Sequence, residues 1–320
     1  MDMNNTSPNT VTLAPMEGVL DPLMRQLLTE INDYDLCVTE FVRVVDCLLP
    51  EHIFYKLSPE LKQGGVTSAG TPVRIQLLGQ DPQALAENAL RAIELGSPGI
   101  DLNFGCPAKL VNKSRGGAAL LKTPNLIRDI IEAVRRVVPS ELPVSAKIRL
   151  GWESAEESFD IAAAVEQAGA SSLAVHGRTK MCGYKAERIN WPAIAAVREQ
   201  VNIPVVANGE IWSHQDALEC VKVTGCRDIM LGRGALNTPN LGNVVKYNAP
   251  AMTWQEVMAL LLRYTQLECR GDKGKYFPNR IKQWFAYLNK VYPEAKALWP
   301  ELRVLRESAQ IVDLLNAQGG

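Results

Sequence analysis

The chain has 320 residues, of which 47% are hydrophobic and 22% are charged, and its formal net charge is −1. This balance excludes disordered and collagen-like classes and is typical of a folded protein with one large domain and a smaller one. No apolar run reaches membrane-spanning length, and the polar residues 1–10 lack the apolar segment of a signal peptide. We therefore expect a cytoplasmic protein with no membrane partner.

The cysteines and histidines argue against a metal site. The seven cysteines are scattered without a C-x-x-C pair, and the three histidines are His52, His176 and His214. Neither pattern has the ligand spacing of a zinc site or of a disulfide framework. Free thiols are typical of a reducing compartment, so we predict no metal.

Short runs rich in apolar and β-branched residues recur along the chain and predict eight strands. These are residues 11–14, 36–39, 73–77, 100–103, 144–148, 172–176, 205–208 and 228–231. The segments between them have helical periodicity. Asp81 and Pro82 suit the N-cap and first position of one helix. Predicted helices cover residues 82–95, 124–138, 159–168 and 213–223.

Eight strand–helix units in about 240 residues match a (β/α)8 barrel, the TIM barrel. A doubly wound open sheet is the competing architecture. The barrel is favoured because eight units suit closure and because polar residues recur where the predicted strands end. In a barrel, those carboxyl ends meet at the catalytic face. The residues concerned are 14–18, Gln76, Asn103, Cys106, Lys147, Arg149, 176–179, 208–210 and 232–234.

Residues 101–109 read Asp-Leu-Asn-Phe-Gly-Cys-Pro-Ala-Lys and place one cysteine on a sharp turn after a predicted strand. Gly105 and Pro107 turn the backbone on either side of Cys106. A thiol held at a strand end suits a proton donor or a nucleophile. The alternative is that Cys106 is a small buried filler without chemistry.

The loops after the last two predicted strands resemble a phosphate-binding cradle. Gly209, Gly232 and Gly234 let backbone N–H groups approach an anion, and Arg233 adds a positive charge. Lys147 and His176 could donate hydrogen bonds to an electron-rich ring such as a flavin. There is no G-x-G-x-x-G fingerprint of a Rossmann site. A competing interpretation makes Lys147 the Schiff-base lysine of an aldolase.

The C-terminal part carries a local positive charge. Residues 248–250 suggest a linker, and residues 253–268 and 280–290 predict helices. Between residues 270 and 306, nine Lys or Arg face three Asp or Glu. Interleaved with Tyr276, Trp284 and Tyr287, these charges suit an RNA backbone and exposed bases. A solvated helical face with packed aromatic residues is the alternative.

Five motifs together resemble those of the tRNA-dihydrouridine synthase family. They are residues 14–18 (Ala-Pro-Met-Glu-Gly), 103–107 (Asn-Phe-Gly-Cys-Pro), 176–179 (His-Gly-Arg-Thr), 208–210 (Asn-Gly-Glu) and 232–234 (Gly-Arg-Gly). Within that family, residues 39–46 and 280–284 are similar to the bacterial C subfamily. The resemblance covers nearly the whole chain and implies a flexible N-terminus (1–10), an FMN-binding barrel (11–247) and a helical tRNA-binding domain (251–320).

The resemblance also implies the chemistry. FMN reduced by NADPH would deliver hydride to C6 of a uridine in the tRNA D loop, at position 16, while Cys106 protonates C5. The implied FMN contacts are Pro15, Met16, Glu17, Gln76, Lys147, His176, Asn208, Gly209, Glu210, Gly232 and Arg233. The implied tRNA contacts are Arg43, Asn103, Arg149, Tyr184, Arg280, Lys282, Tyr287 and Arg303. A monomer is expected.

Two other classes of function stay open from the sequence. An FMN barrel enzyme that reduces a free pyrimidine would not need the basic C-terminal part. A tRNA-binding module without catalysis would not need Cys106 or the glycine loops.

Overall fold

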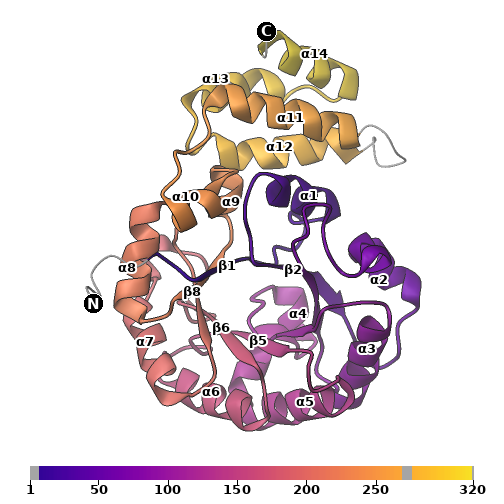
Figure 1. Ribbon diagram of the computed structural model, residues 1–320, viewed down its shortest axis with the longest axis vertical. Coiled ribbons are helices and arrows are strands. Elements are labelled where there is room, and N and C mark those ends of the chain that lie inside the picture. Colours follow the sequence, from indigo (N-terminus) through magenta and orange to yellow (C-terminus); the bar gives the residue numbers. More distant parts are fainter. Residues whose placement is uncertain (1–6, 269–275, 319–320) are drawn as a thin grey trace.

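The computed structural model describes residues 7–268 and 276–318. Eight parallel strands form a closed barrel that helices surround, and four further helices gather beside it (Figure 1). The predicted barrel is confirmed, and the open doubly wound sheet is wrong. The first six residues, Cys269 and the basic residues 270, 273 and 275 lie outside the described part.

Each predicted strand is present, and the strands follow one another around the barrel in chain order. β1 closes the ring by pairing in parallel with β8, where Leu13 lies beside Leu231. The second strand continues four residues past its predicted end, and its pairing with β3 resumes at Phe41 after a register shift that begins at Val38. The strands are β1 (Thr10–Leu13), β2 (Leu36–Arg43), β3 (Val73–Leu78), β4 (Ile100–Asn103), β5 (Val144–Arg149), β6 (Ser172–His176), β7 (Val205–Asn208) and β8 (Asp228–Leu231).

Two outer helices begin where their capping residues predict, whereas the helix predicted at 159–168 is observed at Glu157–Gln167, without a side-chain cap. The Asp81 side chain accepts a hydrogen bond from Ala84 N at 2.7 Å, and Ser213 caps the eighth helix in the same way. The helices are α1 (Pro22–Glu30), α2 (Glu51–Leu57), α3 (Pro82–Glu94), α4 (Lys109–Lys113), α5 (Pro124–Val137), α6 (Glu157–Gln167), α7 (Trp191–Gln200), α8 (His214–Thr224), α9 (Gly234–Asn237) and α10 (Leu241–Tyr247). Three 3-10 helices are η1 (Pro59–Gln63), η2 (Gly117–Lys122) and η3 (Ala186–Arg188).

The barrel interior is divided between an apolar and a polar side. Ala14, Val38, Ala174 and Met230 form a small buried apolar cluster. On the other side of the interior, alternate residues of β3, β4 and β5 bring polar side chains together. Outward-facing residues of the strands join the main core beneath the helices. The alternation follows from the period of two along a strand.

The C-terminal helices lie against the barrel beside α1 and α9 (Figure 1). Trp284 is fully buried, and its Nε1 donates to Leu236 O of α9 at 3.2 Å. Its ring meets that of Tyr264 edge to face, with centroids 5.3 Å apart. These helices are α11 (Trp254–Glu268), α12 (Phe277–Leu288), α13 (Pro293–Leu302) and α14 (Ser308–Gln318). The helix predicted at 280–290 is observed at Phe277–Leu288. Its start lies earlier than predicted, at Phe277 and Pro278, which are both buried in the core.

Among the described residues, no helix is both long and apolar enough to cross a membrane. Within the same residues, no group of three or more His, Cys, Asp or Glu side chains is arranged to hold a metal ion.

Replacing Trp284 by Ala should loosen the C-terminal helices from the barrel. Truncating a buried tryptophan costs about 3–5 kcal/mol, and here a hydrogen bond to α9 is lost as well. Urea unfolding of the two proteins measures the difference. Val291→Ala, at an exposed position, should change the free energy of unfolding by less than about 0.5 kcal/mol. Equal losses in both variants would contradict the assigned role.

Candidate active site

A cavity of about 870 Å³ opens at the carboxyl ends of the strands. Its lining comes from strands β2 to β8, from the loop that follows β1 and from α12. All eleven residues predicted to contact FMN line it: Pro15, Met16, Glu17, Gln76, Lys147, His176, Asn208, Gly209, Glu210, Gly232 and Arg233. Of the predicted tRNA contacts, Asn103, Arg149, Tyr184 and Tyr287 line it as well, and so does Cys106. The motifs therefore converge in one place, as the barrel interpretation requires.

The loop that carries Cys106 is held from several directions. Asn103 Oδ1 accepts hydrogen bonds from the backbone N–H groups of Gly105 and Cys106, both at 3.0 Å. The Cys106 carbonyl accepts from Ala118 N at 3.0 Å. A side chain at Gly117 would collide with that carbonyl, because a Cβ there would lie 2.9 Å from it. The thiol is thus fixed at the cavity wall.

Burial raises the pKa of the Cys106 thiol, and the charge of Glu17 raises it further. The thiol therefore stays protonated at neutral pH. A protonated thiol is a proton donor, whereas a nucleophilic cysteine needs a lowered pKa. The raised pKa favours a proton donor over a nucleophile. The filler interpretation is disfavoured by the position of Cys106, which is only partly buried and lines the cavity.

A chain of hydrogen bonds runs through the barrel interior to the Cys106 loop. Arg74 Nη1 donates to Ser145 Oγ at 3.0 Å, and Ser145 Oγ donates to Asp101 Oδ1 at 2.5 Å. Gln76 Nε2 donates to Asp101 Oδ2 at 2.7 Å, and Gln76 Oε1 accepts from Asn103 Nδ2 at 2.7 Å. A carboxylate only accepts hydrogen bonds, so the NH₂ group of Gln76 must face Asp101. The Gln76 carbonyl oxygen then faces Asn103, whose NH₂ group donates to it.

Lys147 and His176 share the cavity with several other cations. Lys147 Nζ donates to Asn208 Oδ1 at 2.9 Å. Burial and the charge of Arg149 lower the pKa of Lys147 to about 8. Burial, followed by the surrounding cations, also lowers the pKa of His176 well below its usual value. At neutral pH the His176 ring is therefore uncharged, and Lys147 keeps its proton at a cost that an anionic ligand would offset.

Glu210 links two cations of the cavity wall. Its carboxylate binds Arg178 Nη2 at 2.6 Å and Arg233 Nη2 at 3.2 Å, and it accepts from Trp212 Nε1 at 2.9 Å. Arg178 is fully buried, whereas the Arg233 side chain is about one-third exposed. The pair of contacts therefore holds Arg233 at the cavity edge with its charge directed toward any anion bound there.

Tyr184 joins two of these cations across the cavity mouth. The Arg149 and Arg233 guanidinium carbons lie 5.0 and 5.2 Å from its ring centroid. Arg149 Nε also donates to Gly105 O at 2.9 Å, and its Nη1 donates to Gly183 O at 3.0 Å. Arg149 therefore ties the Cys106 loop to the loop that carries Tyr184.

The remaining predicted tRNA contacts lie apart. Arg43 and Arg280 line a second cavity beside the first. Lys282 and Arg303 line neither cavity, and Lys282 Nζ donates to Leu305 O. Arg280 and Lys282 thus point to different surroundings, as their spacing on a helix predicts.

Sequence reasoning missed four residues that shape the main cavity: Glu40, Phe41, Arg178 and Trp212. Arg178 lies within the 176–179 motif, so the sequence placed it near the site but did not reveal its ion pair with Glu210. Trp212 follows the 208–210 motif by two residues and could have been read as a partner for Glu210. Glu40 and Phe41 lie within the 39–46 motif, but the predicted strand ended at residue 39, so their place in the cavity lining was not foreseen.

The fold and the cavity define an enzyme of the (β/α)8-barrel class. A family model described as "Dihydrouridine synthase (Dus)" matches residues 12–315, and the chain belongs to this family. The tRNA-dihydrouridine(16) synthase of Vibrio cholerae is 62% identical over 306 residues, 96% of this chain and 95% of that protein. The protein of that name from Escherichia coli is 60% identical over 307 residues, 96% and 98% of the two chains.

Solved structures with the same fold are more distant. Morphinone reductase in complex with tetrahydroNAD aligns with a TM-score of 0.53 at 12% identity, over 79% of this chain and 90% of that one. Histamine dehydrogenase from Rhizobium aligns with a TM-score of 0.57 at 15% identity, over 77% and 46% of the two chains. At such identities the likeness shows the barrel fold alone.

Membership of the family implies a flavin cofactor, and the cavity fits one. A Cβ built on Gly232 would meet nothing nearer than Ala14 and Met16, each at 4.0 Å, so the glycine leaves room for a ligand beside Arg233. Lys147 and Asn208 lie deeper, on the strand ends, with the polar groups that a flavin ring requires. Both polar groups and positive charge are therefore present in the cavity lining.

Replacing Lys147 by Met should stabilise the flavin-free protein at neutral pH by about 1–3 kcal/mol, because a poorly solvated charge is removed. The pH dependence gives a sharper test. Unfolded Lys147 keeps its proton to about 10.5 but the folded residue only to about 8, so this residue makes stability rise with pH between those values. The change in unfolding free energy from pH 7 to pH 9.5, taken with its sign, should be lower in the variant than in the unmodified protein, because the buried thiols of Cys37 and Cys220 lower the stability of both proteins over that range. An unchanged pH difference would contradict the lowered pKa.

Proposed function

We propose that the chain reduces uridine 16 of the tRNA D loop to 5,6-dihydrouridine, with FMN as the bound flavin and NADPH as reductant. The observation that carries this proposal is the convergence of a protonated thiol, Cys106, with a flavin-sized cavity in a member of the dihydrouridine synthase family. The choice of position 16 rests on the relatives, at about 60% identity over almost the whole chain, that are named for it.

The reaction requires a hydride at C6 of uracil and a proton at C5. When bound, the reduced flavin supplies the hydride. The 5,6 double bond is conjugated to a carbonyl, so negative charge develops at C5 as C6 is attacked, and a nearby acid must neutralise it. Cys106 is that acid: its raised pKa keeps the proton available until the base presents C5.

Asn103 and Arg149 hold the geometry for this proton transfer. Asn103 fixes the backbone of Gly105 and Cys106, and Arg149 ties the same loop to the neighbouring one. The Asn103 side chain also lines the cavity, where it can hydrogen-bond a uracil ring. Holding a reacting group in place lowers the barrier even when the holding group exchanges no proton itself.

The residues proposed for FMN divide into two sets by their chemistry. Gly209, Gly232 and Arg233 suit the phosphate, since they combine backbone N–H groups with a positive charge. Gln76, Lys147 and His176 suit the ring system, where a positive group favours the anionic reduced state. The competing Schiff-base role for Lys147 finds no support, because it would leave Cys106 and the glycine loops without a function.

The tRNA contacts are proposed on both sides of the cavity. Tyr184 is about half exposed at the mouth and is flanked by Arg149 and Arg233. Arg43, Arg280, Lys282, Tyr287 and Arg303 would extend the contact toward and across the C-terminal helices. The proposed division into a catalytic barrel and a tRNA-binding helical part rests on this distribution. The six cysteines that the structure describes are all free thiols, which supports the expected cytoplasmic location.

The decisive test is to map dihydrouridine in tRNA from cells that lack the gene and from cells complemented with it. Loss of the modified base at position 16 alone, restored on complementation, is the expected result. The purified protein should be yellow and should release FMN on denaturation. Normal modification at position 16 in the deletion strain would overturn the proposal.

Cys106→Ala should lower the rate of tRNA reduction by about 10²–10⁴-fold, because the general acid is removed. Flavin content and tRNA affinity should stay close to those of the unmodified protein. Single-turnover reduction of tRNA by the reduced enzyme measures the effect. Cys47→Ser, at an exposed cysteine outside the cavity, is the control. Near-normal turnover in Cys106→Ala would assign the proton to another group.

Asp101 should act as a positioning residue for the same step. Asp101→Leu removes the acceptor that orients Gln76, so kcat should fall by up to about 10²-fold with little change in KM for tRNA. Asp101→Asn keeps an acceptor oxygen and should stay within about fivefold of normal. Arg74→Met combined with Asp101→Leu avoids leaving a buried charge unpaired. If kcat is unchanged in a folded Leu variant, the hydrogen-bond chain plays no part in positioning.

A further inference from the structure

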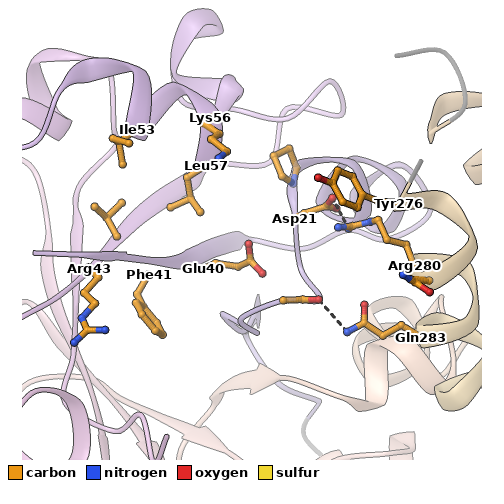
Figure 2. A pocket seen from close by; sticks show the side chains of 14 residues that line it. Asp21, Glu40, Phe41, Arg43, Ile53, Lys56, Leu57, Tyr276, Arg280 and Gln283 are labelled. Atoms are coloured by element: carbon orange, nitrogen blue, oxygen red, sulfur yellow. Dashed lines mark hydrogen bonds and ion pairs between the residues drawn. The ribbon is translucent and has the colours of Figure 1, made fainter. Parts of the chain in front are cut away.

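A second cavity of about 740 Å³ lies between β2, α2 and α12, next to the reaction cavity (Figure 2). Glu40 and Phe41 of β2 line both cavities, so the two are neighbours along one strand. Arg43 and Arg280, two of the proposed tRNA contacts, line this second cavity, but the proposed chemical steps do not involve it.

The walls of the second cavity are fixed without a ligand. Gln283 Nε2 of α12 donates to Gly18 O at 2.9 Å. Arg280, one helical turn earlier, forms an ion pair with Asp21, the residue that caps α1 (Figure 2). Two contacts between α12 and the loop after β1 therefore hold this wall in place, and a preformed cavity binds without the cost of ordering its walls.

The side chains around the cavity have the chemistry that recognises a single unpaired nucleotide. Phe41 and Tyr276 are aromatic rings on which a base can stack. Asn279 and Glu40 offer a donor and acceptors to the edge of a base. Arg43 is exposed at the end of β2 and can reach a backbone phosphate.

We propose that the second cavity binds one unpaired nucleotide of the same tRNA, a near neighbour of the uridine that enters the reaction cavity. The inference rests on the proposed function and deepens it. Because Glu40 and Phe41 belong to both cavities, a short stretch of RNA could occupy the two at once. Binding the neighbouring base would help to offset the few kcal/mol that extrusion of the target base costs.

The charge of the cavity favours RNA over the reductant. Three cations, Arg43, Lys56 and Arg280, face two carboxyl groups, Asp21 and Glu40, which leaves one net positive charge. That balance suits one phosphodiester, whereas the pyrophosphate and 2′-phosphate of NADPH carry several negative charges and would meet the two carboxylates. One wall also belongs to α12, within the segment where positive charges outnumber negative ones by nine to three.

The test is a double-mutant cycle between Tyr276 and the bases of the D loop. Tyr276→Ala should weaken tRNA binding by about 5–100-fold, the range for loss of one stacked base, and Tyr276→Phe should retain binding. Tyr247→Ala, at a similarly exposed tyrosine that lines neither cavity, is the matched control and should have no effect. Dissociation constants are measured on full-length synthetic tRNA.

Each D-loop nucleotide is then replaced, one at a time, by an abasic residue. At one position the abasic tRNA should bind the unmodified protein and Tyr276→Ala equally weakly, whereas elsewhere the two losses should add. Additive losses at every position would overturn the proposal, because no base would then occupy the cavity. A rise in KM for NADPH with unchanged tRNA binding would overturn it in favour of the reductant.

Direct binding keeps this test separate from the proposed function. If the protein forms no dihydrouridine at position 16, the proposed function fails, whatever the binding cycle shows. If position 16 is modified but Tyr276→Ala binds tRNA normally, only the second cavity has been misassigned.

Discussion

One buried carboxylate, that of Asp101, gives the interior of the barrel its order. A carboxylate can only accept hydrogen bonds, so both groups beside it must donate, and each amide beyond it has only one orientation left. The effect passes through Gln76 and Asn103 to the backbone of Cys106. The charge itself is balanced within the same interior by Arg74, which reaches Ser145. A polar barrel interior thus costs some stability and gives a fixed reaction site in return.

The second ordering principle is an excess of positive charge around the cavity. Burial and then four cations lower the pKa of His176, and burial with the charge of Arg149 lowers the pKa of Lys147. Glu210 balances only part of this charge, through Arg178 and Arg233. An anion bound in the cavity would relieve the repulsion among these cations. The neutral state of His176 and the lowered pKa of Lys147 are two results of the same charge distribution.

Local sequence was sufficient for much of this picture and failed where distant segments meet. Each strand could be found from its own apolar run, and Asp81 and Ser213 marked helix starts through chemistry confined to one turn. The site motifs lie at strand ends, so the barrel topology alone was enough to bring them together. By contrast, the last four residues of β2 depend on an irregular register with β3, which no periodicity within β2 reveals. The second cavity requires α2 and α12, more than two hundred residues apart, to face each other.

The pairing of β1 with β8 has a consequence for synthesis of the chain. Thr10–Leu13 must wait for Asp228–Leu231 before the ring can close, so most of the chain leaves the ribosome first. Until then β1 is an exposed edge strand, open to pairing with other chains. The C-terminal helices come later still, yet Gln283 and Arg280 hold the loop that follows β1. The order of emergence therefore makes closure of the barrel a late, long-range event, and the edge of β1 stays unpaired until β8 has been made.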